Sequence, residues 1–193
     1  MKENNNSRKG CALAGILFLL KFILYGKEDC LSMNENFVIR PVKREESGKI
    51  LDFIKYIAEY EKMLDQVVAT EELLDEWIFQ KGLVDVLFAE ENGEVVGFAL
   101  FFSNFSTFVG RAGLYLEDLF VKPEHRGKGY GKALLKKLAQ IAVERKCRRM
   151  EWCCLDWNTP SINFYKSVGA IPMDEWTTYR LAGKNLDKFA AEE

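Results

Sequence analysis

Three alternating glycines separate a strand-like run from an amphipathic helical run, and no other feature of the 193-residue sequence constrains the fold as strongly. They belong to the hexapeptide RGKGYG at positions 126–131, which follows the apolar run 114–121. Glycine tolerates positive φ, so successive backbone N–H groups can converge on one anion. The N-terminus of the following helix adds a partial positive charge. The hexapeptide therefore predicts a cradle for a pyrophosphate group, with Arg126 and Lys128 at its rim.

Two common phosphate loops do not fit these residues. A Walker A loop has Ser or Thr after its Gly-Lys pair, whereas Gly131-Lys132 is followed by Ala133. A dinucleotide fingerprint with the spacing G-x-G-x-x-G would need glycine in place of Lys132 or Leu134. Both kinds of nucleotide site are therefore excluded.

Around the cradle, apolar periodicity predicts one domain, from residue 34 to 193, in which strands and helices alternate. Strands are predicted at 37–41, 84–89, 95–102, 114–121, 149–155 and 176–181. Helices are predicted at 45–60, from Thr70 onward, after 131 and at 158–168. Asn92-Gly93 predicts a tight hairpin, and 103–113 is predicted to be a loop. The order indicates an α/β protein of the α+β kind, with a mixed sheet flanked by helices.

The helix predicted from Thr70 has its N-cap in the Thr70 side chain, followed by two glutamates in the first turn. Its apolar side chains are expected to form one buried face: Leu73, Leu74, Trp77 and Ile78.

Composition argues against nucleic-acid and metal sites. The net charge is −2 at pH 7, without the basic footprint of nucleic-acid-binding proteins. The sequence has five cysteines, an odd number, and no two of them have C-x-x-C spacing. Its single histidine is His125, so no zinc site is expected. Free thiols are typical of a reducing compartment, which indicates a cytoplasmic protein.

An apolar run precedes the predicted domain. Residues 11–25 are apolar except for Lys21, and basic residues stand before them. The run is shorter than the roughly 20 residues of a membrane-spanning helix, and no A-x-A cleavage site follows it. We expect translation to begin at Met33, with residues 1–33 as an extension outside the domain. A membrane anchor at 11–25 and a signal peptide are the alternatives.

RGKGYG after a strand resembles the acetyl-CoA signature R/Q-x-x-G-x-G/A of the GNAT superfamily of N-acetyltransferases. Five further segments are similar to the diamine (spermidine/spermine) acetyltransferases of that superfamily: 37–41, 60–63, 114–121, 157–165 and 169–170. The resemblance covers residues 37 to about 189. It implies the GNAT fold, a mixed, mostly antiparallel twisted sheet with flanking helices. It also implies acetyl-CoA as cosubstrate, no metal and a homodimer.

The same resemblance assigns residues to the cofactor. The cradle and the strand before it would bind acetyl-CoA through Leu119, Phe120, Val121, Arg126, Gly127, Lys128, Gly129, Tyr130, Gly131 and Lys132. Backbone N–H groups near Phe120 and Val121 would hold the acyl oxygen, as in an oxyanion hole. Asn158 would hydrogen-bond the pantetheine arm, and Tyr165 would contact the sulfur end of the cofactor.

Acetyl transfer from a thioester to an ammonium group needs a proton acceptor and a proton donor. Glu117 and Asp118 adjoin the cradle, and strand alternation predicts that their side chains lie on opposite faces. The resemblance implies that Glu117 accepts the proton through water, while Asp118 lies near the cationic substrate. It also implies that Tyr165 protonates the departing thiolate. A covalent route through Cys153 or Cys154 finds no support, because no His–Cys pair accompanies them.

The amine side is assigned by resemblance to Tyr60, Glu61, Glu117, Asp118 and Tyr179. Lys62 and residues 170–178 depart from the diamine pattern, and Tyr179 stands where those enzymes commonly have tryptophan. The predicted reaction is direct acetyl transfer, in a ternary complex, to a small cationic amine: a diamine, a polyamine or a lysine-like amino acid such as thialysine. The alternatives are acetylation of a protein N-terminus or lysine, and acyl-CoA binding without catalysis.

Overall fold

The computed structural model describes residues 36–192, which divide into two compact units, one ending at Trp152 and the other beginning at Cys153. The apolar run 11–25 and the expected start at Met33 lie outside the described residues. One domain from 34 to 193 stays a prediction. Within 36–192, no helix has the length and apolar character of a membrane span.

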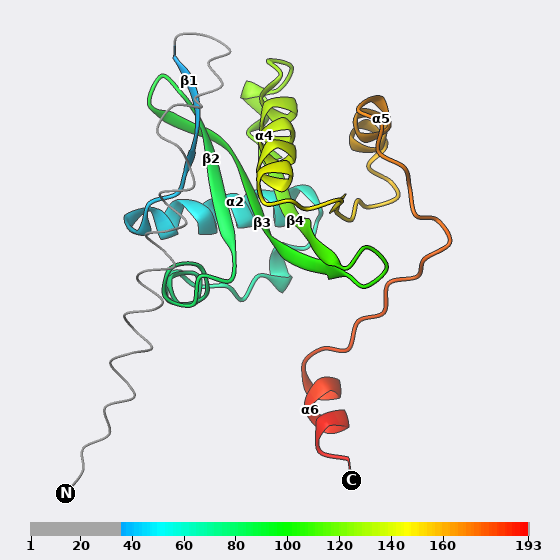
Figure 1. Ribbon diagram of the computed structural model, residues 1–193. Helices are drawn as coiled ribbons and strands as arrows, with labels where there is room; N and C mark the ends of the chain where they lie inside the picture. Colours follow the sequence, from blue (N-terminus) through cyan, green and yellow to red (C-terminus); the bar gives the residue numbers. More distant parts are fainter. Residues whose placement is uncertain (1–35, 193) are drawn as a thin grey trace, which may run out of the picture. The chain divides into compact units, whose positions relative to one another are not determined.

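A five-stranded sheet forms the centre of the first unit (Figure 1). The strands are neighbours in chain order: β1 (Phe37–Pro41), β2 (Asp85–Glu91), β3 (Glu94–Ser106), β4 (Arg111–Val121) and β5 (Met150–Glu151). Every neighbouring pair is antiparallel except β4 and β5, which are parallel. The mixed, mostly antiparallel sheet that the sequence predicts is therefore confirmed.

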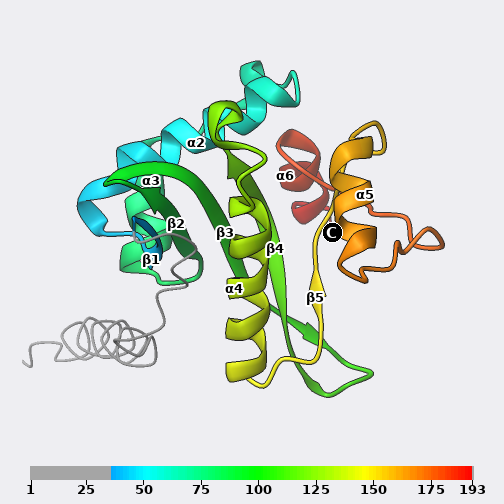
Figure 2. The ribbon, with the colours of Figure 1, turned by 90° about the horizontal axis from the view of Figure 1, so that it is seen from above.

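Two helices cover opposite faces of this sheet (Figure 2). α4 (Tyr130–Glu144) packs on the face where Leu119 and Val121 approach Gly131. α2 (Ser47–Tyr60) packs on the face of the neighbouring Phe120, because adjacent strand residues point to opposite sides. The core between α2 and the sheet combines aliphatic side chains such as Ile50 with the aromatic rings of Phe53, Phe88, Phe98 and Phe120.

Short helical turns connect α2 to β2. They are the 3-10 turn η2 (Leu64–Gln66), the helix α3 (Glu71–Leu74) and the π-helical turn η3 (Asp75–Gln80). Thr70 caps α3 as predicted, because its side chain accepts a hydrogen bond from the Leu73 N–H. The predicted buried face is wrong in part: Ile78 is buried, but Leu73 and Trp77 are exposed. The π turn contains Trp77 and has more residues per turn than an α-helix, so it rotates this side chain; Leu73 precedes the turn and is not affected by it.

The two hairpins differ in how well the sequence predicts them. Asn92 and Gly93 form the β2–β3 turn with φ of 54° and 83°, as the tight-hairpin prediction requires. The loop predicted at 103–113 is wrong, because β3 and β4 pair as far as Ser106 and Arg111. Alternating polar and aromatic residues are also typical of an exposed hairpin, and this one exposes Phe108 almost fully.

The second unit is helical where it is regular. Residues 153–192 contain α5 (Thr159–Ser167) and α6 (Lys184–Ala190) and no strand. The strand predicted at 176–181 is therefore wrong, and the strand predicted at 149–155 is reduced to Met150–Glu151. A strand needs a hydrogen-bonding neighbour, which local alternation of apolar residues does not provide.

α2 and α4 end in the same backbone motif, although neither has glycine at the critical position. Lys62 and Lys146 follow the two helices with φ of 60° and 58°. After each lysine an N–H group bonds five residues back, from Met63 N to Ala58 O at 2.7 Å and from Cys147 N to Ala142 O at 2.8 Å. These are the hydrogen bonds of a Schellman motif, in which glycine commonly takes the left-handed position.

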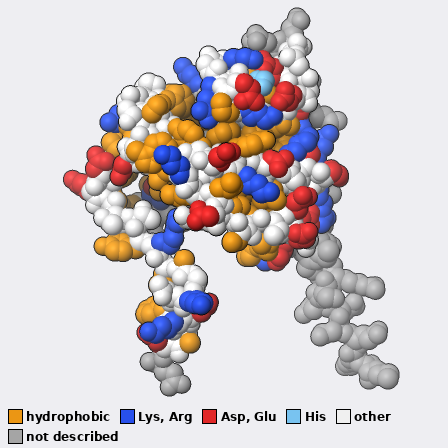
Figure 3. Space-filling view, turned by 180° about the vertical axis from the view of Figure 1, so that it is seen from behind, with side chains coloured by type: hydrophobic (Ala, Val, Ile, Leu, Met, Phe, Trp, Pro, Cys, Tyr) orange, Lys and Arg blue, Asp and Glu red, His pale blue; other side chains and the backbone are white. Residues whose placement is uncertain are grey.

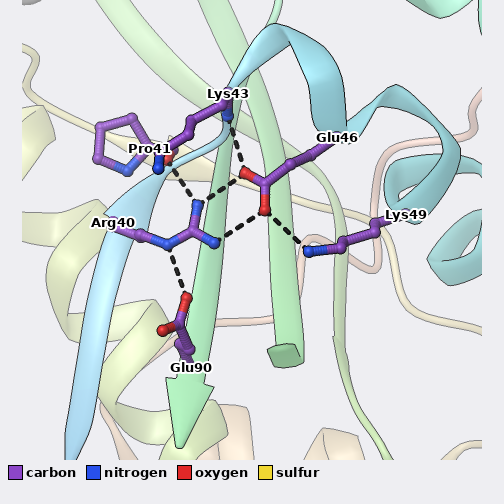
Figure 4. A network of polar contacts seen from close by, with 6 residues as sticks. All are labelled: Arg40, Pro41, Lys43, Glu46, Lys49 and Glu90. Carbon is purple, nitrogen blue, oxygen red and sulfur yellow. Dashed lines mark hydrogen bonds and ion pairs between the residues drawn. The ribbon is translucent and has the colours of Figure 1, made fainter. Parts of the chain in front are cut away.

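A charged network fixes the turn between β1 and α2 (Figure 4). Arg40 of β1 donates from Nη1 and Nη2 to both carboxylate oxygens of Glu46, at 2.8 and 2.9 Å, in the 3-10 turn η1 (Arg44–Glu46). Its Nε donates to Glu90 Oε2 of β2 at 2.7 Å. Glu46 also accepts from the Lys43 N–H and from Lys49 Nζ, each at 3.0 Å. One guanidinium thus joins two strands to the start of α2.

We expect Glu46→Gln to destabilise the fold by about 2 kcal/mol at neutral pH, the scale of a hydrogen-bonded charge. The bond from Arg40 lowers the pKa of Glu46 from 4.5 to about 2, so the folded state favours its carboxylate. This contribution is complete above pH 4.5 and is lost as the pH falls toward 2. Urea unfolding between pH 3 and 7 should show the difference from wild type shrinking as the pH falls. The exposed neighbour Glu45→Gln is the control, and a difference that does not change with pH would contradict the assignment.

Candidate active site

A β-bulge in β4 sets the direction of the acidic side chains that the sequence assigns to the site. Leu100 of β3 pairs with Asp118, and the next β3 residue, Phe101, pairs with Leu116. Glu117 therefore has no residue opposite it in β3, which is the defining feature of a bulge.

The bulge places Glu117 and Asp118 on the same face of the sheet. Asp118 is two residues from Phe120, which packs beneath α2, so Asp118 also points to the α2 face. Leu116 pairs with Phe101. The ring of Phe101 lies beneath the guanidinium of Arg145, which is the C-cap residue of α4. Leu116 thus points to the α4 face and its neighbour Glu117 to the α2 face. The expectation of opposite faces is wrong, because it assumes an uninterrupted strand.

A third carboxylate, Glu61 at the end of α2, completes an acidic cluster of Glu61, Glu117 and Asp118. The pKa of Asp118 is raised from 3.8 to about 6, mainly by burial and in addition by the negative charges of Glu117 and Glu61. Burial also raises the pKa of Glu61. Glu117 is exposed, whereas Asp118 is half-buried. The cluster can attract a cation, and a carboxylate with a pKa near 6 can accept a proton at neutral pH.

On the edge of β4 that is remote from β3, some backbone N–H groups point away from the β3–β4 pair. β4 pairs with β5 at Leu114 and Tyr115. Further along, the Lys122 N–H donates to Val96 O of β3 at 2.9 Å, so Phe120, two residues earlier, also donates toward β3. Leu119 and Val121 then direct their N–H groups to the other edge. Of the two donors that the sequence suggests for an acyl oxygen, Val121 has this direction and Phe120 does not.

The glycine hexapeptide has the backbone that its sequence predicts. Gly127 and Gly129 have φ of 78° and 86°, and Gly129 is the N-cap of α4. A Cβ atom on Gly127 would meet nothing within 4 Å, so this position needs glycine for its φ and not for space. The first N–H groups of α4 have no acceptors within the helix. Together these features fit a pyrophosphate.

The long side chains of the cradle are held by the protein itself. Arg126 Nε donates to Val121 O at 3.0 Å, and its guanidinium lies 5.3 Å from the centre of the Tyr60 ring. Lys128 forms an ion pair with Glu91, and Tyr130 donates a hydrogen bond to the same carboxylate. Tyr130 can thus offer only its backbone to a cofactor, and Lys132 is exposed.

Glu91 is a residue of this region that the sequence does not single out. It lies at the end of β2, where the sequence pattern predicts only a hairpin. Its partners follow 34 to 39 residues later, so no local spacing connects them.

The remaining residues that the sequence assigns to the site lie in the second unit. Asn158 caps α5, accepting a hydrogen bond from the Ser161 N–H at 3.4 Å. Tyr165 is half-buried on α5, and its pKa is raised to about 12 by burial and then by the charge of Cys154. Its phenol therefore carries its proton at neutral pH. Tyr179 is exposed in an irregular segment.

Comparisons with known proteins agree with this geometry. The family model described as "Acetyltransferase (GNAT) family" matches residues 50–170. The chain is 38% identical over 167 residues to the thialysine N-epsilon-acetyltransferase of Bos taurus, covering 80% of this chain and 98% of that protein. It is 45% identical over 92 residues to an L-ornithine N5-acetyltransferase of Arabidopsis thaliana, covering 48% of this chain and 40% of that protein.

Solved structures show the same fold. An integron cassette protein from the mobile metagenome of V. cholerae superposes with a TM-score of 0.69 at 32% sequence identity, covering 82% of this chain and 100% of that one. The family match contains the bulged strand, the glycine cradle and α5. The chain is therefore an enzyme of the GNAT acetyltransferase family, which uses acetyl-CoA as its cosubstrate.

Proposed function

We propose that this enzyme transfers an acetyl group from acetyl-CoA to the primary amine of a small cationic substrate: a lysine-like amino acid, a diamine or a polyamine. The acidic cluster of Glu61, Glu117 and Asp118 is the observation that carries the proposal. It gathers negative charge from the end of α2 and from the strand that leads into the cradle. Relatives named for thialysine and L-ornithine, both α-amino acids with a second amino group at the end of the side chain, support this substrate class.

The acidic cluster has two tasks in this proposal. One is to attract the ammonium groups of the substrate, aided by the ring of Tyr60. The other is to accept the proton that the amine must lose before it can attack. Asp118 suits this second task at neutral pH, because its pKa of about 6 lies close to the working pH. Glu117 is exposed and can pass the proton on through water.

The cradle and the free edge of β4 would hold the cosubstrate. When bound, acetyl-CoA supplies the thioester whose acetyl group is transferred. The backbone of residues 126–131 would bind its pyrophosphate, and the Leu119 and Val121 N–H groups are the available donors for its carbonyl oxygen. In the second unit, we propose that Asn158 binds the pantetheine arm and that Tyr165 donates the proton to the leaving thiolate. Tyr179 would contribute to the amine side.

The setting of the reaction is also part of the proposal. Acetyl-CoA is a cytoplasmic metabolite, which supports a cytoplasmic enzyme. We also propose a homodimer, which the resemblance to the diamine acetyltransferases supports.

An amine panel tests the substrate class. We expect thiol release from acetyl-CoA to be fastest with thialysine, lysine, ornithine, spermidine or a short diamine, and slow with an uncharged alkylamine or a peptide N-terminus. Asp118→Asn should lower kcat/KM for the preferred dication by about 10²-fold or more, because an ionised partner of the substrate and the proposed proton acceptor are lost together. Equal rates for peptides and small amines would favour a protein acetyltransferase. No release with any amine would favour binding without catalysis.

Gly129→Val tests the cradle. A β-branched side chain disfavours the φ of 86° that Gly129 adopts, so the turn cannot keep its backbone. We expect acetyl-CoA binding to be abolished in a calorimeter while the circular dichroism spectrum remains that of a folded protein. Gly82→Val has a comparable φ of 62° outside the cradle and is the control. Unchanged affinity in Gly129→Val would place the pyrophosphate elsewhere.

Tyr165→Phe tests the proton donor. The substitution keeps the ring and removes the phenolic proton, so acetyl-CoA binding should persist while turnover falls by about 10²-fold, the scale of general acid catalysis. Steady-state kinetics at saturating acetyl-CoA provide the measurement. Turnover within about threefold of wild type would remove Tyr165 from the mechanism.

A further inference from the structure

A single carboxylate at the end of β2 holds the cradle at three points. Glu91 accepts hydrogen bonds from Lys128 Nζ at 2.8 and 3.0 Å and from the Tyr130 hydroxyl, and its Oε2 lies 2.8 Å from His125 Nδ1. These contacts lower the pKa of Glu91 to about 2, with the bond from Lys128 as the largest cause. Figure 3 shows acidic, basic and histidine side chains gathered on one part of the surface.

The three contacts are spread along the turn that forms the cradle. His125 ends the 3-10 turn η4 (Pro123–His125), Lys128 stands between the two glycines of positive φ, and Tyr130 begins α4. Tyr130 is fixed a second time, because its ring stacks on Phe37 of β1 with centroids 4.2 Å apart. The start, the middle and the end of the turn are therefore tied to the β1–β2 edge of the sheet.

A glycine turn needs such an anchor more than other loops do. Glycine loses more conformational freedom on ordering than any other residue, and a Cβ on Gly127 would contact nothing. A turn that is already ordered loses less entropy when it binds a ligand. A carboxylate beside an anion site would by itself oppose binding, but the ammonium of Lys128 offsets its charge.

We propose that Glu91 is a positioning residue for acetyl-CoA: it orders the cradle through Lys128, Tyr130 and His125 without touching the cofactor. The proposal rests on the proposed function in one respect, namely that the cradle binds acetyl-CoA. It also assigns Lys128 to the protein's own structure, which leaves the backbone N–H groups of the cradle to meet the phosphates.

Two variants test the anchor. Glu91→Ala removes all three contacts, and we expect its Kd for acetyl-CoA to rise about tenfold, as for one or two lost hydrogen bonds to a charged group. Tyr130→Phe keeps the ring, the stacking and the Lys128–Glu91 pair but loses one donated hydrogen bond, so its Kd should rise about threefold. In Glu91→Ala, kcat at saturating acetyl-CoA should stay close to that of wild type, because positioning of the cradle affects binding before the chemical step.

Glu94→Ala is the matched control. Glu94 lies on the same hairpin and pairs with Lys122 at 2.6 Å, so this variant removes the same charge without releasing the turn. Calorimetry should find its acetyl-CoA affinity close to that of wild type. Equal affinities of Glu91→Ala, Tyr130→Phe and wild type would overturn the inference, as would an equal loss in Glu94→Ala. If Glu91→Ala does not fold, Tyr130→Phe decides alone. A wild-type protein that does not bind acetyl-CoA would overturn the proposed function itself.

Discussion

Glu117, the bulge residue with no residue opposite it in β3, determines which side chains of β4 point to each face of the sheet. Without the bulge, strict alternation from Leu116 would turn Asp118 toward α4 and away from Glu61. It would also move Leu119 and Val121 to the α2 face, where they could not pack against Gly131 at the start of α4. One extra residue therefore lets the strand gather acidic groups on one face and seat the cradle helix on the other.

The sequence predicts best those parts of the fold whose pattern is local and long. The apolar stripe of α4 and the Asn92–Gly93 turn need no knowledge of distant residues, and the structure has both. The errors arise where the structure of a segment depends on a pairing strand elsewhere in the chain. Residues 103–106 become strand because 111–114 pair with them, and 176–181 lack such a neighbour. Trp77 is exposed because a π turn changes the number of residues per turn.

The residues of the site likewise divide into those that the sequence predicts and those that it does not. The cradle can be read from six consecutive residues, because a phosphate needs N–H groups that are adjacent in the chain. The shared face of Glu117 and Asp118 depends on the register between β3 and β4, which no spacing within β4 reveals. Glu91 is further still from prediction, since its role depends on a turn that begins more than thirty residues later.

The two lysines that end α2 and α4 have a consequence for how much stability this fold can still gain. A residue with a Cβ atom in the left-handed region costs roughly 1–2 kcal/mol relative to its ordinary conformations, and Lys62 and Lys146 both have such φ values. Natural proteins are rarely at their stability optimum, and helix ends are among the usual places for improvement. Lys146 follows the cradle helix at its far end, whereas Lys62 directly follows Tyr60 and Glu61. The fold thus holds unused stability at two helix ends, and only one of them lies beside residues proposed to meet the amine.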